Sequence, residues 1–212
     1  PFPEADCWTT FVSLPTALGL TTEEIRQAPH IDYPRLQLPL NWKLPDRKLH
    51  IGIAWAGSDL NDINRHRSIP VEQFFDLYRV PGIQLYGLQI GQYAQQLYDS
   101  HGLPVVRDLS PYVRDVVDTI SILKQLDLVI CCESALAHIC ALANVECWVP
   151  YSHLGKDYRM GSHGRDQVWS NHRVFNQGES LTWQPTFDDI EFALEARIHA
   201  IDRAVGKKSA RA

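Results

Sequence analysis

Short apolar runs alternate with amphipathic segments along most of this sequence. From residue 49 onward, the apolar runs predict buried strands at residues 49–57, 83–91, 103–109, 127–132, 145–150 and 172–177. Between them, apolar residues at helical spacing predict helices at residues 71–78, 92–102, 115–126 and 134–143, and a long closing helix follows at residues 186–206. Continuous apolar strands separated by helices are typical of a parallel sheet that is covered on both faces. The pattern therefore predicts an α/β fold, a Rossmann-like parallel sheet with helices on both faces.

The first part of the chain does not share this pattern. Residues 1–48 are irregular and rich in proline, which disfavours a long helix, and only a short helix near residues 12–18 is predicted. We interpret residues 1–48 as a connector and residues 49–206 as one domain, followed by a basic, disordered tail at residues 207–212. Because the chain begins at Pro1 without an initiator methionine, we expect the connector to follow a missing or truncated N-terminal domain.

Composition and charge narrow the class of protein. The formal net charge of -5, spread along the chain, gives no electrostatic reason to expect nucleic acid or an anionic membrane as a partner. No apolar run approaches the ~20 residues that a membrane-spanning helix needs. The five cysteines lack the regular spacing of a disulfide-bonded scaffold, so they are more typical of a protein in a reducing compartment. We therefore expect a cytoplasmic protein that binds no nucleic acid and has no membrane span.

Polar residues gather in the loops that follow the predicted strands. These loops cover residues 56–68, 89–92, 108–115, 131–135 and 150–166. In an open parallel sheet, ligands bind in the crevice beyond the carboxyl ends of the strands. We therefore expect a functional site in these loops.

The stretch "LVICCESALAHICALA" (128–143) contains several residue types that could react or bind a metal. Cys131 and Cys132 are adjacent, so within a strand they point to opposite faces. Neither Cys140 nor Cys147 completes the ligand spacing of a zinc site. A nucleophilic serine would need a G-x-S-x-G turn, which "CESAL" (132–136) lacks. The pattern indicates core packing for the cysteines and no metal.

Glu133 and Ser134 open the helix that is predicted after this strand. The first N–H groups of a helix have no partner within it, so they can bind an anion such as a phosphate. His138 would lie on the same helix face as Ser134. The plainer alternative is that Ser134 is an N-cap and His138 a hydrogen-bonded core histidine. The residues of this stretch alone favour the plainer alternative.

Two other loops carry candidate binding residues. Gly57 and Ser58 follow the first predicted strand, where a glycine lets the backbone approach a ligand, and Arg67 can grip a phosphate. The loop matches neither G-x-G-x-x-G nor a Walker motif, so a solvated loop is the alternative. The loop at residues 154–169 is polar and rich in glycine, which is typical both of functional loops and of surface decoration.

The order of these motifs carries a family resemblance. The chain contains "GIAWAGS", "RHRSIP", "YGLQIG", "ESALAHICALANVECWVPY" and "DYRMGSHGRDQVWSNHRVFNQ", from about residue 10 to residue 200 with the flanking segments. They are similar to "GLVWAGS", "NRSIP", "YSLQKG", "DTAxAHLAGALGKPVWVLL" and "DWRW" followed by "SPWYP..RLFRQ". These forms belong to the C-terminal half of heptosyltransferase-like glycosyltransferases. More closely, the chain resembles the glycosyltransferase domains that follow tetratricopeptide repeats in bacterial proteins.

The resemblance implies a GT-B architecture, in which two Rossmann-like domains face a cleft and no metal or other cofactor is required. It implies that the C-terminal domain holds a nucleoside diphosphate sugar, here through Gly57, Ser58, Arg67, Gln89, Glu133, Ser134, Ala135 and His138, with further loop contacts from Asp157, Arg159 and Arg165. The general base is expected in the N-terminal domain, so this chain would not catalyse transfer alone. The acceptor could be a glycan, a lipid or a protein.

The chain also departs from the family forms. Ile90 stands where the family usually has lysine, and Glu133 and Ser134 stand where it has aspartate and threonine. Ala141 replaces a glycine of the helix. These changes leave open a second interpretation, a non-catalytic scaffold or interaction module that kept the fold and lost the site. A nucleotide-sugar epimerase is a third alternative, which matches "WAGS" and "RSIP" less well.

Overall fold

The structure is a computed structural model that describes residues 6–10, 13–21, 23–24, 43, 48–60, 62–154, 164, 166 and 168–209. In the connector it contains the short helix α1, Leu14–Ala17, within the segment where a short helix is predicted. Most of the remaining connector lies outside the described residues.

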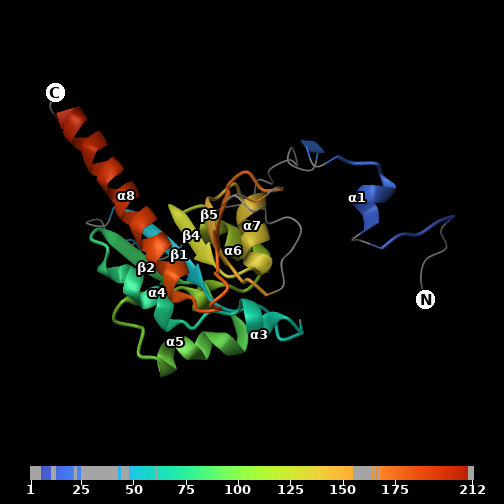
Figure 1. Ribbon diagram of the computed structural model, residues 1–212, viewed down its shortest axis with the longest axis horizontal. Coiled ribbons are helices and arrows are strands. Elements are labelled where there is room, and N and C mark those ends of the chain that lie inside the picture. The colour runs from blue at the N-terminus through green and yellow to red at the C-terminus, as the bar shows by residue number, and fades with distance from the viewer. Residues whose placement is uncertain are drawn as a thin grey trace.

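The described part of the chain forms one six-stranded sheet with the order β3-β2-β1-β4-β5-β6. Every neighbouring pair of strands is parallel. The strands are β1 Leu49–Ala54, β2 Ile83–Gly87, β3 Val106–Asp108, β4 Leu128–Cys131, β5 Cys147–Tyr151 and β6 His172–Asn176. Each overlaps a predicted strand. The inner strands β1, β2, β4 and β5 are buried along their whole length between two layers of helices (Figure 1), whereas the edge strands β3 and β6 also carry exposed residues. The predicted Rossmann-like fold class is confirmed.

The helices agree with the prediction in position but differ in detail. The helix predicted at residues 71–78 consists of α4, Glu72–Asp76, and the 3-10 turn η2, Leu77–Arg79. The helix predicted at residues 92–102 consists of the 3-10 turn η3, Gly91–Ala94, and α5, Gln95–Asp99. The others are η4 Ser110–Tyr112, α6 Val116–Leu123, α7 Ala135–Leu142 and α8 Gln184–Ser209. Because α8 continues to Ser209, the prediction that the tail is disordered from residue 207 was wrong for its first three residues.

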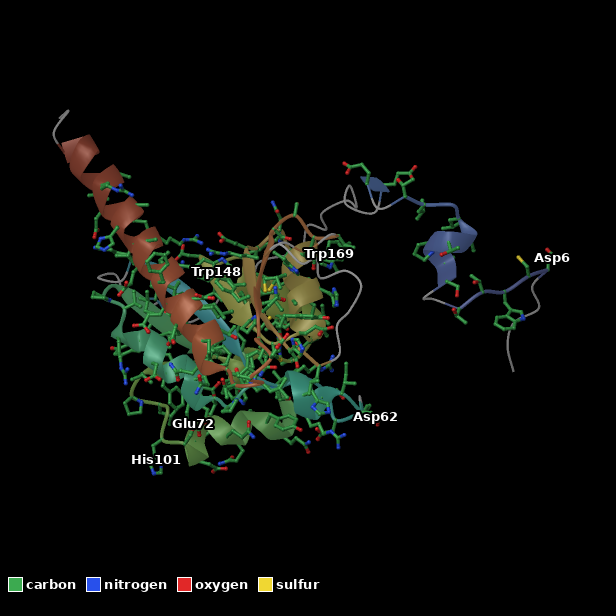
Figure 2. All side chains as sticks on the ribbon, in the orientation of Figure 1. Asp6, Asp62, Glu72, His101, Trp148 and Trp169 are labelled. Atoms are coloured by element: carbon green, nitrogen blue, oxygen red, sulfur yellow. The ribbon has the colours of Figure 1, made fainter. Side chains whose placement is uncertain are left out.

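One helix was not predicted. The helix α3, Asn64–Arg67, consists of four polar residues, so it lacks the apolar periodicity that predicts a helix. It follows the loop after β1, and Asp62 stands at the tip of that loop (Figure 2). The loop forms one wall of a cavity, and Asn64 of α3 accepts a hydrogen bond from Gly57 in that loop.

Two apolar clusters hold the helices on the two faces of the sheet. On one face, residues of α4, α5 and α8 pack against the strands, and Phe74 meets Phe187 edge to face with ring centroids 4.9 Å apart. On the other face, α6 and α7 pack through Ile120, Leu123 and Ala137. The end of α8 extends beyond the sheet (Figure 1), and its residues 202–206 are exposed. None of the helices within the described ranges is both long and apolar enough to cross a bilayer.

The cysteines of β4, α7 and β5 belong to this packing. Cys131 lies in the cluster of one face and Cys132 in that of the other, as their adjacency predicts. The Sγ atoms of Cys131 and Cys147 are 3.6 Å apart, and Cys140 is buried beside them. Burial raises the pKa of the Cys132 thiol, which keeps it protonated and unreactive. No group of three or more His, Cys, Asp or Glu in the described part of the chain is arranged to hold a metal ion.

The strand order places a crevice at the centre of the sheet. From β1 the chain builds outward through β2 and β3, and it then returns to the other side of β1 with β4. The carboxyl ends of β1 and β4 are therefore a topological switch point, where the loops diverge to opposite faces and leave room for a ligand. Residues 55–60 follow β1 and residues 132–135 follow β4, so both of these predicted loops meet at this crevice.

Candidate functional site

A cavity of about 480 Å³ opens at the carboxyl edge of β2, β1 and β4. Its walls are the loop after β1, the loop after β2, one residue of α6 and the first turns of α7. Five residues predicted to bind the donor line this cavity, namely Gly57, Ser58, Gln89, Ser134 and Ala135. Three others, Arg67, Glu133 and His138, do not line it. The structure therefore brings five of these eight predicted residues to one cavity and leaves three outside its lining.

Gly57 lets the side chain of Arg67 approach the end of β1. A Cβ atom on Gly57 would lie 2.7 Å from Nη2 of Arg67 and 2.8 Å from Oδ1 of Asn64, closer than real Cβ contacts. The Arg67 charge also acts on Cys132 at the end of β4, where it opposes the effect of burial, which raises the pKa of that thiol. The guanidinium therefore lies at the crevice between β1 and β4, beside the cavity.

Asn64 organises this wall of the site, and sequence reasoning missed it. Its side chain is 3% exposed, and its Oδ1 accepts hydrogen bonds from the Gly57 N–H at 3.0 Å and the Ser68 hydroxyl at 3.2 Å. The Nε of Arg67 donates to the same oxygen at 3.4 Å. The family motif gave no signal for it, because aligning "RSIP" (67–70) places the asparagine of the family form "NRSIP" at His66 and not at Asn64.

Asp59 and Tyr93 were also missed, because they lie far apart in the sequence. The Tyr93 hydroxyl donates to Oδ1 of Asp59, and Nδ2 of Asn64 donates to the same oxygen at 3.2 Å. The hydrogen bond to Asp59 is the main cause that raises the pKa of Tyr93. Both residues line the cavity, and Asp59 is the only charged side chain among its described lining residues.

Gln89 holds the backbone of this site together. Its Oε1 accepts from the N–H groups of Trp55 at 3.0 Å and Ala56 at 2.9 Å. Its Nε2 donates to the carbonyl oxygens of Ala56 at 3.1 Å and Ile90 at 3.2 Å. An amide side chain has two donor hydrogens and two acceptor positions, so the backbone occupies all of them. Gln89 lies at the cavity as predicted, but its polar atoms fix the loops after β1 and β2.

The N-terminus of α7 faces the cavity through Ser134 and Ala135. Ser134 occupies the N-cap position with an extended backbone, yet its side chain makes no capping hydrogen bond. The plain N-cap interpretation is therefore correct for its position and wrong for its hydrogen bond. Glu133 is 8% exposed and does not line the cavity, so its place differs from the donor contact that the resemblance implies.

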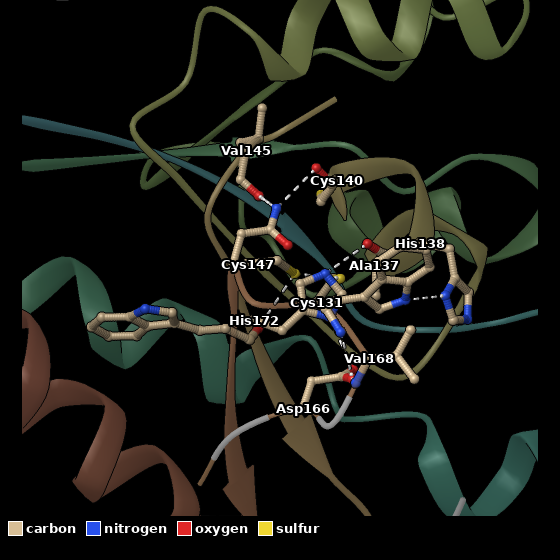
Figure 3. Close-up of polar contacts among 12 residues, drawn as sticks. Cys131, Ala137, His138, Cys140, Val145, Cys147, Asp166, Val168 and His172 are labelled. Atoms are coloured by element: carbon tan, nitrogen blue, oxygen red, sulfur yellow. Dashed lines mark hydrogen bonds and ion pairs between the residues drawn. The ribbon is translucent and has the colours of Figure 1, made fainter. Parts of the chain in front are cut away.

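His138 faces a different part of the molecule from Ser134. Its Nδ1 accepts a hydrogen bond from Nε1 of Trp169 at 3.1 Å (Figure 3). The indole N–H can only donate, so Nδ1 of His138 carries no proton. His138 is half-buried and hydrogen-bonded, which agrees with the plainer of the two predictions.

The loop before β6 is tied to α7 by a buried pair. Oδ1 of Asp166 accepts from the N–H groups of Val168 at 2.7 Å and Trp169 at 2.9 Å, and its Oδ2 lies 3.3 Å from Nδ1 of His172. Nε2 of His172 lies 3.0 Å from the Ala137 carbonyl oxygen in α7 (Figure 3). Burial opposes ionisation of Asp166, but these hydrogen bonds outweigh it and lower its pKa. The predicted contacts Asp157, Arg159 and Arg165 lie outside the described residues.

Solved structures with this architecture include heptosyltransferases. The chain is similar to E. coli heptosyltransferase WaaC with ADP-2-deoxy-2-fluoro heptose, at 15% identity and a TM-score of 0.52 over 74% of this chain and 46% of that one. It is similar to E. coli ADP-heptose lps heptosyltransferase II at 13% identity and a TM-score of 0.52, over 82% of this chain and 54% of that one. The chain has the Rossmann-like fold of one half of a heptosyltransferase-like GT-B protein.

The likeness at this identity concerns the fold alone, and the chain spans about half the length of these structures. No protein-family model matches the chain, and no curated protein matches it.

Proposed function

We propose that this chain is the donor-binding domain of a metal-independent GT-B glycosyltransferase and that it takes a nucleoside diphosphate sugar at the crevice between β1 and β4. In this proposal the diphosphate lies beside Gly57 and Ser58 and in front of the first N–H groups of α7. The acceptor is a glycan, a lipid or a protein. The cytoplasmic location expected from the cysteines stays a prediction.

The observation that carries the proposal is the meeting of Gly57, Arg67 and the start of α7 at the topological switch point. The absence of a side chain on Gly57 leaves room for the Arg67 guanidinium at 2.7 Å from the position that a Cβ would take. The helix start supplies oriented N–H groups, and the guanidinium supplies a fixed positive charge. A diphosphate is the ligand group that uses both.

This arrangement also suits the chemistry of glycosyl transfer. As the bond between sugar and diphosphate breaks, negative charge develops on the leaving nucleoside diphosphate. Arg67 and the α7 amides are positioned to stabilise that charge without a metal ion. The general base that activates the acceptor is expected in an upstream domain, either a second Rossmann-like half or one associated with tetratricopeptide repeats. We therefore propose that the chain does not catalyse transfer alone.

Calorimetric titration of the full-length protein with UDP-, ADP- and GDP-sugars tests the proposal. At least one of them should bind, and Arg67→Ala should weaken its affinity by about 10- to 100-fold, the range for a charge-assisted hydrogen bond. Arg65→Ala is the matched control, because Arg65 is exposed and its Nε donates to the neighbouring His66. Failure of all three sugars to bind the full-length protein would contradict the proposal.

A second candidate function, a non-catalytic interaction module, is favoured by the side chains on the cavity rim. Ile90 is 56% exposed on this rim at the position where the family usually has a lysine. The charged residue among the described lining residues is Asp59, which repels a diphosphate. If the full-length protein binds no nucleotide sugar and Arg67→Ala changes nothing, this second candidate is the better account.

A further inference from the structure

The cavity has two chemically different ends. Thr119 of α6 and Leu136 and Ile139 of α7 line one end, together with Leu88, so this end is largely apolar. Asp59 and Tyr93 line the other end, on the side of α3 and η3. Gly57, Ser58 and the start of α7, which are proposed above to bind the diphosphate, line the same cavity.

A nucleoside diphosphate sugar has the same division. Its base is flat, with faces that stack on apolar side chains, its diphosphate is anionic, and its sugar carries several hydroxyl groups. The apolar end suits the base. The Asp59 end does not suit the diphosphate, because two anionic groups at short range repel each other. It does suit hydroxyl groups, since a carboxylate accepts hydrogen bonds and hydroxyl groups donate them.

The carboxylate of Asp59 is held in one orientation. Its Oδ1 accepts from the Tyr93 hydroxyl and from Nδ2 of Asn64 at 3.2 Å, and Asn64 itself is buried. Within the described residues no hydrogen bond reaches Oδ2 of Asp59. The network therefore fixes one oxygen and leaves the other available at the cavity wall.

We propose that Asp59, oriented by Tyr93 and Asn64, recognises the hydroxyl groups of the transferred sugar and so distinguishes a nucleoside diphosphate sugar from the free nucleoside diphosphate. This inference rests on the proposed function and adds a specificity-determining residue to it. Asp59 Oδ2 accepts a hydrogen bond from one or two adjacent sugar hydroxyls. A deoxy sugar that lacks the contacted hydroxyl leaves the carboxylate without this partner and binds less tightly.

The Asp59→Asn variant separates recognition from support of the loop. An asparagine at this position keeps one oxygen to accept from Tyr93 and Asn64, but it replaces the second acceptor by an amide donor and removes the negative charge. Tyr93→Phe is the companion variant, because it removes the hydroxyl that orients Asp59 and leaves the carboxylate in place. The melting temperature of each variant shows whether the fold is intact.

The test measures the affinity of the full-length protein for a nucleoside diphosphate and for the matching nucleoside diphosphate sugar. Asp59→Asn should weaken the affinity for the sugar nucleotide by about tenfold. It should leave the affinity for the free nucleoside diphosphate unchanged or increase it, since a repelling charge is lost. Tyr93→Phe should also weaken the affinity for the sugar nucleotide relative to that for the free nucleoside diphosphate, but by a smaller factor than Asp59→Asn. Equal weakening of both ligands would overturn the inference, because Asp59 would then contact the ribose or only support the loop.

The failure of this inference differs from the failure of the proposed function. If the wild-type protein binds neither ligand, both the proposed function and the inference are wrong. If the wild-type protein binds both ligands and Asp59→Asn leaves their affinity ratio unchanged, the inference alone is wrong.

Discussion

The side-chain oxygen of Asn64 accepts a hydrogen bond from the backbone N–H of Gly57 at 3.0 Å, which joins α3 to the end of β1. The two residues are seven positions apart, and the bond closes the loop between them into a defined wall of the cavity. Arg67 and Ser68 donate to the same oxygen, so the candidate phosphate cation depends on this one buried amide for its position.

Asn64→Ala should therefore affect both stability and binding. The change leaves the Gly57 N–H and the Ser68 hydroxyl without their acceptor, which costs about 1–3 kcal/mol for each buried group that stays unpaired. Ser68→Ala is the control, since it removes one donor and should cost about 0.5–1.5 kcal/mol. Urea unfolding measures both values. Equal stability of the two variants would show that Asn64 does not organise the loop.

Gly57→Ala should weaken ligand binding through Arg67. The added Cβ would lie 2.7 Å from the end of the Arg67 side chain, which can move away, and 2.8 Å from Oδ1 of the buried Asn64, so the variant should lose folding stability as well as the position of Arg67. The affinity of the Gly57→Ala variant for the sugar nucleotide should therefore fall by about as much as that of Arg67→Ala. Gly178→Ala is the matched control, because no atom lies within 4 Å of its added Cβ. Calorimetry would contradict this explanation if Gly57→Ala bound the ligand as tightly as the wild type.

Ser134 and Asp115 occupy equivalent helix starts but should respond differently to replacement by alanine. Oδ1 of Asp115 accepts from the Asp118 N–H at 2.9 Å and caps α6, whereas Ser134 makes no capping hydrogen bond. Asp115→Ala should cost about 1 kcal/mol of folding stability. Ser134→Ala should cost less and should weaken nucleotide binding more. Unfolding and binding measured on both variants would contradict this if the order were reversed.

The buried Asp166 should contribute to the acid sensitivity of the fold. Its pKa in the folded protein is lowered from 3.8, so its stabilising effect is present above the pKa of the unfolded chain and is lost as the pH falls through the folded value. The stability of the wild type should therefore decrease below about pH 4. Asp166→Asn should have a flatter profile in this range. Identical slopes of unfolding free energy against pH for the two proteins would contradict this role.

The sheet could be predicted because its information is local. The four inner strands are buried runs of mostly apolar residues. The longer helices repeat apolar residues at helical spacing, as in α6 and α8. The short helix α3 could not be found in this way. Its four residues are polar, and contacts of Asn64 with Gly57 and Tyr93 hold it in place.

The candidate site was predicted in outline because parallel strands bring their carboxyl ends to one edge. The roles within it depend on contacts between residues distant in sequence. Asp59 and Tyr93 are 34 positions apart, and so are Gln89 and Trp55. No pattern in either loop announces these pairs. The same is true of His138, whose hydrogen bond to Trp169 spans 31 positions.

The most direct test of the central claim is a crystal structure of the full-length protein with the nucleoside diphosphate sugar that calorimetry selects. The proposal predicts the diphosphate at the crevice between β1 and β4, with its oxygens within hydrogen-bonding distance of the Ser134 or Ala135 N–H groups and of the Arg67 guanidinium. A nucleotide bound elsewhere, or one whose diphosphate touches neither the start of α7 nor Arg67, would contradict it.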